Sequence, residues 1–263
     1  WGDTVSLRLL EYMMTCSGHA PVLIIPISRE SDAIRQFFLS HGLSVMKLGP
    51  IDEASASKLT EKLLLLDVPE TQLVERIVKT AGGSPFFIEN IVQNLIESGV
   101  IARNDTGVFY LAKNVKSISI PSSIQNLILS RVNALPYEEQ VVCKTASVIG
   151  RVFTSDVLES LVPESLTKYT VEQALTDLAA HGIISADGND SRSYTFKDIT
   201  ICDVVYDTVL ETTRREINKS ILLYLERKNS VNLSAVSERL DYYAIEARDY
   251  DKVLEYSIVS AQK

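Results

Sequence analysis

Few residues of this chain have the types and spacing that chemistry requires. The three cysteines, Cys16, Cys143 and Cys202, lie far apart in segments of apolar periodicity, which is typical of buried free thiols in a reducing compartment. The three histidines have no cysteine or carboxylate at metal-ligand spacing, so no metal site is predicted. Arg29 follows an apolar run, at the point where α/β sheets hold ligands. Its position indicates ligand binding; the alternative is a solvated surface arginine.

The segments around Arg29 predict part of an α/β sheet. Residues 21–27 form an unbroken apolar run, which is typical of a strand buried on both faces of a parallel sheet. A helix is predicted before it, over residues 3–15, and a helix over 32–39 and a short strand over 44–48 are predicted after it. This alternation of helix and strand favours a small α/β remnant at the start of the chain.

The clearest helix start in the sequence is at Ser84 and Pro85. Serine is a good N-cap, proline is favoured at the first helical position, and Gly99 is placed to end the helix. The plain interpretation of Pro85 is therefore a helix start. Other elements of the same block are predicted as helices over 52–66 and 69–81, and a hairpin over 100–104 and 107–111.

The third block has helices followed by two short strands around a polar turn, the layout of a winged-helix domain. Its helix over 170–181 carries Glu172 and Asp177 and no lysine or arginine, and the whole chain has a net charge of −8. Such a helix is unsuited to nucleic-acid phosphates, so we expect it to pack onto the α/β core that begins the chain. The predicted elements are helices over 121–134, 137–149, 154–161, 170–181, 199–212 and 214–227, and strands over 183–185 and 194–196.

Both ends of the sequence predict a fragment of a longer protein. Trp1 already stands at the start of a helix, with no methionine or polar arm before it. Residues 233–263 predict a pair of amphipathic helices joined at 246–249. Because helical-repeat arrays need about three units, we expect further repeats after Lys263.

The order of the motifs resembles that of ATPases in the STAND branch of the AAA+ superfamily. The motif that begins at Trp1 resembles the segment after the Walker B strand, and the strand predicted before Arg29 resembles a sensor strand. The motif that begins at Gly83 resembles the "GxP" helix, and the motifs from Ile120 onward resemble a winged helix. The residues that carry the resemblance are Trp1-Gly-Asp-x-x-Ser-Leu-x-Leu-Leu, Arg29, Gly83-Ser-Pro-Phe-Phe-Ile-Glu-Asn, Ile120-Pro-x-x-Ile-Gln-x-Leu-Ile-x-x-Arg131, Ala146-x-x-Ile-Gly-Arg-x-Phe153, and Tyr194-x-Phe196 with Val205-Tyr206-Asp207 and Arg214-Arg215.

The resemblance implies a mostly α fold with a small α/β remnant. Four parts are expected: the C-terminal remnant of a P-loop nucleotide-binding core (1–50), a helical lid with the GxP helix (51–116), a winged helix (117–228) and the first hairpin of a tetratricopeptide-like array (229–263). This arrangement is similar to the module behind the cyclase domains of soluble-type class III adenylyl cyclases. It is also similar to modules of large sensor kinases and bacterial transcription regulators.

The resemblance also implies site residues for ATP or ADP with Mg²⁺ in the intact protein. Pro85 would lie near the adenine, Arg29 would reach the γ-phosphate, and Asp3 would lie near the metal and the attacking water unless it is only a helix N-cap. Asp198 stands where the family commonly has a histidine facing the phosphates; a carboxylate would repel them unless Lys197 or a metal compensates. Asn218 likewise stands where a histidine is usual. The two departures together indicate either a degenerate switch or one whose hydrolysis is slow or absent.

A P-loop NTPase needs the pattern Gly-x-x-x-x-Gly-Lys-Ser/Thr, and this sequence does not contain it. We therefore expect this chain alone to bind no nucleotide and to hydrolyse no ATP. No apolar run approaches the roughly 18 residues of a membrane helix, so no membrane segment is predicted.

The expected function is a nucleotide-dependent regulatory switch in a cytoplasmic multidomain signalling protein. The output domain would lie in the same chain, most readily an adenylyl cyclase that converts ATP to cyclic AMP, and the helical repeats would bind a protein partner. Two alternatives stay open: the ATPase region of a transcription regulator or sensor kinase, and a catalytically dead interaction scaffold. The residues before Trp1 would separate them, because a missing Walker lysine would favour the scaffold.

Overall fold

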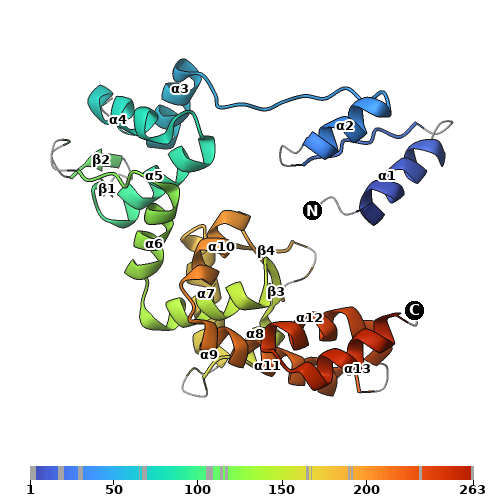
Figure 1. The fold of residues 1–263 in the computed structure, drawn as a ribbon. Coiled ribbons are helices and arrows are strands. Elements are labelled where there is room, and N and C mark those ends of the chain that lie inside the picture. Colours follow the sequence, from blue (N-terminus) through green and yellow to red (C-terminus); the bar gives the residue numbers. More distant parts are fainter. Residues whose placement is uncertain are drawn as a thin grey trace. The chain divides into compact units, whose positions relative to one another are not determined.

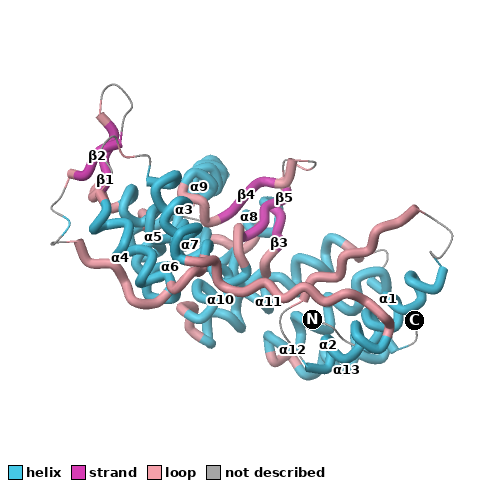
Figure 2. Tube along the Cα trace, turned by 90° about the horizontal axis from the view of Figure 1, so that it is seen from above, coloured by secondary structure: helices cyan, strands magenta, loops and turns pink. Residues whose placement is uncertain are grey.

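The protein is mostly helical, with two small antiparallel sheets (Figures 1 and 2). It divides into two compact units, residues 1–50 and 51–263, which are considered separately below. No helix in the described part of the chain is both long and apolar enough to span a lipid bilayer. The computed structural model describes residues 4–16, 21–28, 32–64, 66, 70–104, 109–112, 115, 118–163, 166, 168–188, 190, 192–230 and 233–261.

The first unit contains two helices, α1 (Thr4–Cys16) and α2 (Asp32–Ser40). Both lie where the apolar periodicity predicts helices, and both predictions are confirmed to within one residue at each described end. His41, directly after α2, places its Nε2 at 3.3 Å from Oε1 of Glu11 in α1. The two helices of this unit are thus joined by a polar contact.

The two strands predicted in the first unit are absent, which corrects the expected sheet. Residues 21–28 and 43–50 belong to no strand, and most of their apolar side chains are exposed, Leu23 by 83% and Ile27 by 92%. A strand exists only through hydrogen bonds to a neighbouring strand. An apolar run indicates that a segment tends to be buried, but it does not provide a neighbouring strand to pair with. The described part of this unit contains no such strand.

The first half of the second unit is a helical cluster with a hairpin. Its core is formed by apolar side chains of three helices, among them Leu73, Ile77, Ile88 and Ile91, all at most 1% exposed. The hairpin pairs Ala102 with Tyr110 and confirms the predicted pair of strands. The elements are α3 (Glu53–Leu64), α4 (Thr71–Ala81), α5 (Pro85–Glu97), β1 (Ile101–Arg103) and β2 (Phe109–Leu111).

The second half contains helices and a three-stranded sheet, followed by a helical hairpin. In the sheet β5 lies between β3 and β4, and both pairings are antiparallel. The elements are α6 (Ile124–Ala134), α7 (Tyr137–Ile149), β3 (Val152–Thr154), α8 (Ser155–Glu159), α9 (Lys168–Ala180), β4 (Ile184–Ala186), β5 (Ser193–Phe196), α10 (Ile199–Asp207), α11 (Glu211–Lys228), a 3₁₀ turn (Leu233–Val236), α12 (Ser237–Ala247) and α13 (Tyr250–Ala261).

Strand β3 was not predicted from the sequence. It has three residues and runs directly into α8, so it is too short to show an alternating pattern. Helix α9 begins at Lys168, two residues earlier than predicted, which adds one lysine at its start. Its apolar side packs into the core of the second unit through Val171, Leu175 and Leu178. The expected packing of this helix onto the first part of the chain stays a prediction.

Helix α6 joins the two halves of the second unit. Leu127 belongs to the core of α3, α4 and α5, whereas Ile128 and Val132 belong to the larger core formed with α7, α9 and α10. The C-terminal hairpin is also attached: Tyr243 of α12 is buried and donates a hydrogen bond from its hydroxyl to the carbonyl of Ile149, at 3.0 Å. Residues 51–263 are therefore built on continuous packing.

Candidate functional site

Two of the four site residues predicted from the resemblance can be placed. Pro85 is the first residue of α5, and Asp198 directly precedes α10. Asp3 and Arg29 lie outside the described residues. The predicted grouping of Arg29 with Pro85 thus stays a prediction.

Pro85 begins α5 as the sequence indicates. The Ser84 side chain accepts a hydrogen bond from the amide of Phe87 at 3.3 Å, and proline occupies the first helical position. This start fixes the rotation of α5, so that Phe86, Glu89 and Gln93 share one side of it. The same side of α5 forms one wall of a cleft.

The cleft has a volume of about 500 Å³ and is enclosed by α5, α6, the turn after α9 and the junction of β5 with α10. It offers two amides, two carboxylates, an arginine, a lysine and a histidine beside apolar side chains. Its lining residues are Leu63, Phe86, Glu89, Asn90, Val92, Gln93, Ile96, Arg131, His181, Gly182, Lys197, Asp198 and Ile201. Asp198 and the helix begun by Pro85 therefore meet at one cleft, although Pro85 itself does not line it.

Asp198 has a structural role that the sequence analysis did not assign to it. Its Oδ1 accepts a hydrogen bond from the amide of Thr200 at 2.7 Å, which makes it the N-cap of α10. Its charge is placed at the positive end of a helix dipole. Lys197 precedes it and is exposed. The Lys197 side chain ends beside Gly182: if Gly182 carried a Cβ, that atom would lie 3.8 Å from Nζ. A lysine at the cleft thus accompanies the carboxylate.

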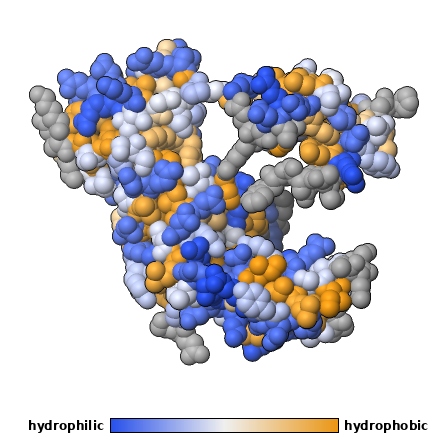
Figure 3. Space-filling view, viewed as in Figure 1, coloured by the Kyte–Doolittle hydropathy of each residue, from blue (hydrophilic) through white to orange (hydrophobic). Residues whose placement is uncertain are grey.

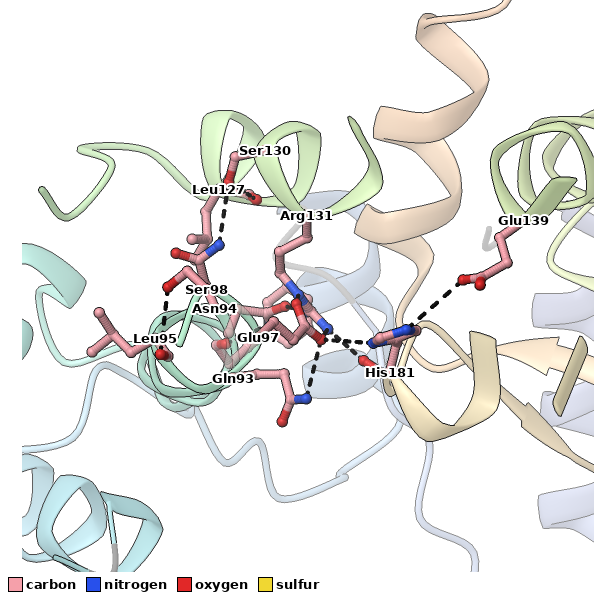
Figure 4. A network of polar contacts seen from close by, with 12 residues as sticks. Gln93, Asn94, Leu95, Glu97, Ser98, Leu127, Ser130, Arg131, Glu139 and His181 are labelled. Carbon is pink, nitrogen blue, oxygen red and sulfur yellow. Dashed lines mark hydrogen bonds and ion pairs between the residues drawn. The ribbon is translucent and has the colours of Figure 1, made fainter. Parts of the chain in front are cut away.

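Arg131 of α6 is the centre of a buried polar network at the base of the cleft (Figure 4). The residue is 5% exposed. Its Nε and Nη2 donate to the two carboxylate oxygens of Glu97 at 2.9 and 3.0 Å, and its Nη1 donates to Oδ1 of Asn90 at 2.6 Å. Nη2 also donates to the backbone carbonyl of His181. One guanidinium group thus connects α5, α6 and the turn after α9.

The His181 side chain extends this network toward α7. Its Nδ1 lies 3.5 Å from Oε1 of Glu97, and its Nε2 lies 3.8 Å from Oε2 of Glu139. Burial raises the pKa of Glu139, and the neighbouring charge of His181 acts in the opposite direction. Oε2 of Glu139 accepts no hydrogen bond from any described residue. The imidazole in Figure 4 lies between the two carboxylates and is within 4 Å of both.

The arrangement is suited to binding and to coupling of helices. The described lining includes no serine, threonine or cysteine that could act as a nucleophile. No group of three or more potential metal ligands occurs among the described residues. The mixture of apolar walls, amides and two cations is typical of sites for polar small molecules.

Sequence reasoning missed Glu97 and His181, and it treated Asn90 and Arg131 only as parts of motifs. One signal was available for Arg131: it follows Leu127 by four residues and precedes Val132, so it lies on the apolar side of α6. An arginine in such a position needs an internal partner. The identity of that partner depends on tertiary packing, which the sequence pattern does not contain.

Comparison with known proteins gives no relationship on which to build. No family model matches the chain, and no curated protein matches it significantly.

Proposed function

We propose that this chain is the regulatory, nucleotide-responsive region of a larger signalling protein of the STAND type. The observation that carries the proposal is the cleft between α5 and the β5–α10 junction, where the helix begun by Ser84 and Pro85 faces Lys197 and Asp198. These are the two segments that the motif order assigns to the helical lid and the winged helix.

The cleft has dimensions and groups that suit part of a nucleotide. Its volume of about 500 Å³ lies within the range of roughly 300–1,000 Å³ found for small-molecule sites. Phe86 and Ile201 provide apolar surface for a purine ring, and Gln93 provides an amide. Lys197 supplies a positive charge for phosphate. A ligand held here would contact both halves of the second unit.

The network around Arg131 provides a means of coupling. Arg131 ties α5 to α6 and to the carbonyl of His181, so a ligand that pulls α5 toward Lys197 acts on all three elements. A ligand shifts such an equilibrium only by its different affinity for the two arrangements. The proposed nucleotide would therefore bind one arrangement of α5 and the β5–α10 junction more tightly.

The chemistry of the parent protein is part of the same proposal. The phosphate-binding loop and the acidic pair for Mg²⁺ would come from sequence that precedes Trp1, and the output would be a soluble-type class III adenylyl cyclase in the cytoplasm. A transcription regulator or sensor kinase remains the alternative output. For the present chain we expect no ATP hydrolysis; phosphate release that depends on cleft residues would contradict this.

Hydrogen exchange with and without ADP tests the switch in a protein that includes the upstream segment. We expect ADP to protect the amides of α5 and of residues 197–201. Replacement Lys197→Gln should weaken ADP binding about tenfold, the loss expected of one charge-assisted hydrogen bond. The matched control is Lys219→Gln, which removes an exposed lysine of α11 outside the cleft. Unchanged exchange in both segments, or an upstream sequence without a P-loop, would refute the proposal.

An interaction scaffold is the second candidate, and the surface of α13 favours it. Tyr250, Leu254 and Ile258 follow each other at four-residue spacing and are 73%, 66% and 51% exposed, so they form one apolar stripe. Hydrophobic side chains gather over α12 and α13 in Figure 3. Binding of a protein partner that Leu254→Asp abolishes, with no response to nucleotide, would favour the scaffold over the switch.

A further inference from the structure

A second cavity lies where α10 ends, α11 begins and α12 ends. Its volume is about 320 Å³, and it shares no lining residue with the cleft described above. Arginines dominate it: Arg214 and Arg215 come from the first turn of α11, and Arg248 directly follows α12. The cavity is thus a separate place in the fold, with a different chemistry.

Arg214 is held without an acceptor for its guanidinium group. Its Cζ lies 4.5 Å from the centre of the Tyr206 ring, which fixes the group by a cation–π contact. Among the described residues no hydrogen bond or ion pair of Arg214 is found. The Nε atoms of Arg214 and Arg215 are both enclosed and unsatisfied. Buried unsatisfied donors are rare in proteins, so neither guanidinium group has a full set of partners among the described residues.

Arg248 has an unusual backbone conformation. Its φ of +55° is the one positive value among the described residues other than glycine. Glycine or asparagine normally occupies this position after a helix, because other side chains are strained there. The Arg248 side chain returns to the cavity, where its Nη2 donates to Oε1 of Glu211 at 2.6 Å. Arg248 thus brings a third positive charge to the cavity from a backbone position that glycine would occupy with less strain.

The cavity has an excess of positive charge in an acidic protein. Three arginines face two carboxylates, Glu211 and Glu246, whereas the chain as a whole has a net charge of −8. Glu211 is occupied, because it accepts hydrogen bonds from both Arg215 and Arg248. The hydrogen bond from Arg215, followed by the charges of Arg215, Arg248 and Arg214, holds the pKa of Glu211 below its usual value. Arg215 and Arg248 donate hydrogen bonds to Glu211, whereas Arg214 acts on it through its charge alone. Arg214 is therefore the cation left for an outside anion.

We propose that this cavity binds a small phosphate monoester, with the phosphate on Arg214 and Arg248 and an apolar or aromatic part against Tyr206 and Ile245. Guanidinium groups bind phosphate through paired, charge-assisted hydrogen bonds. The volume is at the lower end of the range of about 300–1,000 Å³ for small-molecule sites, which leaves room for a group larger than phosphate. Glu246 lines the same cavity and weakens the attraction. The proposal is independent of the nucleotide switch.

Calorimetric titration of the full chain with phenyl phosphate at low ionic strength tests the site. We expect Arg214→Gln to weaken binding about tenfold, the loss expected of one charge-assisted hydrogen bond. Glu246→Gln should tighten binding, because it removes a nearby negative charge. The matched control is Arg227→Gln, an exposed arginine in the last turn of the same helix α11 and outside the cavity, which should leave the affinity unchanged.

The variant Arg248→Gly separates binding from folding. Glycine adopts the positive φ without strain, so the melting temperature should be retained or raised, while phenyl phosphate binding should fall. A purely structural role for Arg248 predicts the opposite pair of results. The proposal is overturned if the native chain does not bind phenyl phosphate at millimolar concentration, or if Arg227→Gln weakens binding as much as Arg214→Gln does.

Discussion

Replacement of Arg131 by methionine should destabilise residues 51–263 strongly. Methionine replaces the apolar stem of the side chain as far as about Nε, but it removes the guanidinium group and every hydrogen bond that this group donates. Those bonds join Arg131 to Glu97, Asn90 and the carbonyl of His181. Since the arginine is 5% exposed, water cannot replace the lost partners at the centre of the network.

The expected loss of folding stability depends on the buried groups that lose their partner when Arg131 is replaced. Removal of one partner from a buried ion pair costs about 3–5 kcal/mol. The Glu97 side chain retains 19% of its exposure and still accepts from the amide of Gln93. We therefore expect the lower end for Arg131→Met, about 3 kcal/mol. Glu97→Gln keeps the shape and should cost about 1–2 kcal/mol. The double variant should cost less than the sum of the two single losses, by at least about 1 kcal/mol.

Urea denaturation followed by far-ultraviolet circular dichroism measures these losses. Tryptophan fluorescence is unsuitable, because the one tryptophan of the chain, Trp1, belongs to the other unit. The control is Arg215→Gln, which breaks an exposed i,i+4 pair with Glu211 and should cost less than about 1 kcal/mol. A loss for Arg131→Met no larger than that of the control, or strictly additive single losses, would refute the role of Arg131 as a hub.

Two further predictions concern titratable groups. Hydrogen bonds, first of all from Lys228, hold the pKa of Asp156 well below its usual range. Such a depressed pKa stabilises the fold above the unfolded value of about 3.9, and the stabilisation is lost as the pH falls through the folded pKa. Asp156→Asn should thus cost about 1 kcal/mol at pH 7, a value reduced for solvent screening, and the difference in urea midpoint should shrink on acidification. Burial raises the pKa of the Cys143 and Cys202 thiols to about 12, whereas Cys16 is exposed. A thiol reagent at pH 8 should therefore titrate one cysteine in the native chain and three in urea; fast reaction of all three without urea would contradict this.

The sequence was sufficient where the determinants are local. Helix α7 begins at Tyr137 and ends at Ile149 as predicted, because proline precedes it and Gly150 follows it. The start of α5 was equally predictable from Ser84 and Pro85, since capping is a contact between neighbours in the chain. The sequence failed for the apolar runs at 21–27 and 44–48, because a strand depends on a partner that may lie anywhere along a chain.

The candidate site was predictable only in outline. The motif order brought Pro85 and Asp198 into one hypothesis, and the cleft lies between the elements that these residues begin. The N-cap role of Asp198 could have been read from its position before an apolar helix. The partners of Arg131 could not, because Glu97 is 34 residues away from it and His181 is 50 residues away. Contacts at such separations are set by packing of the helices.

The hydroxyl of Tyr243 has a mechanical consequence. It fastens α12 to the last residue of α7, while α12 also packs along α11. A displacement of the C-terminal hairpin would therefore be transmitted directly through side chains to the core around α7. Because β3 contacts α7 and pairs with β5, the displacement would move these strands before it moved α3 or α4.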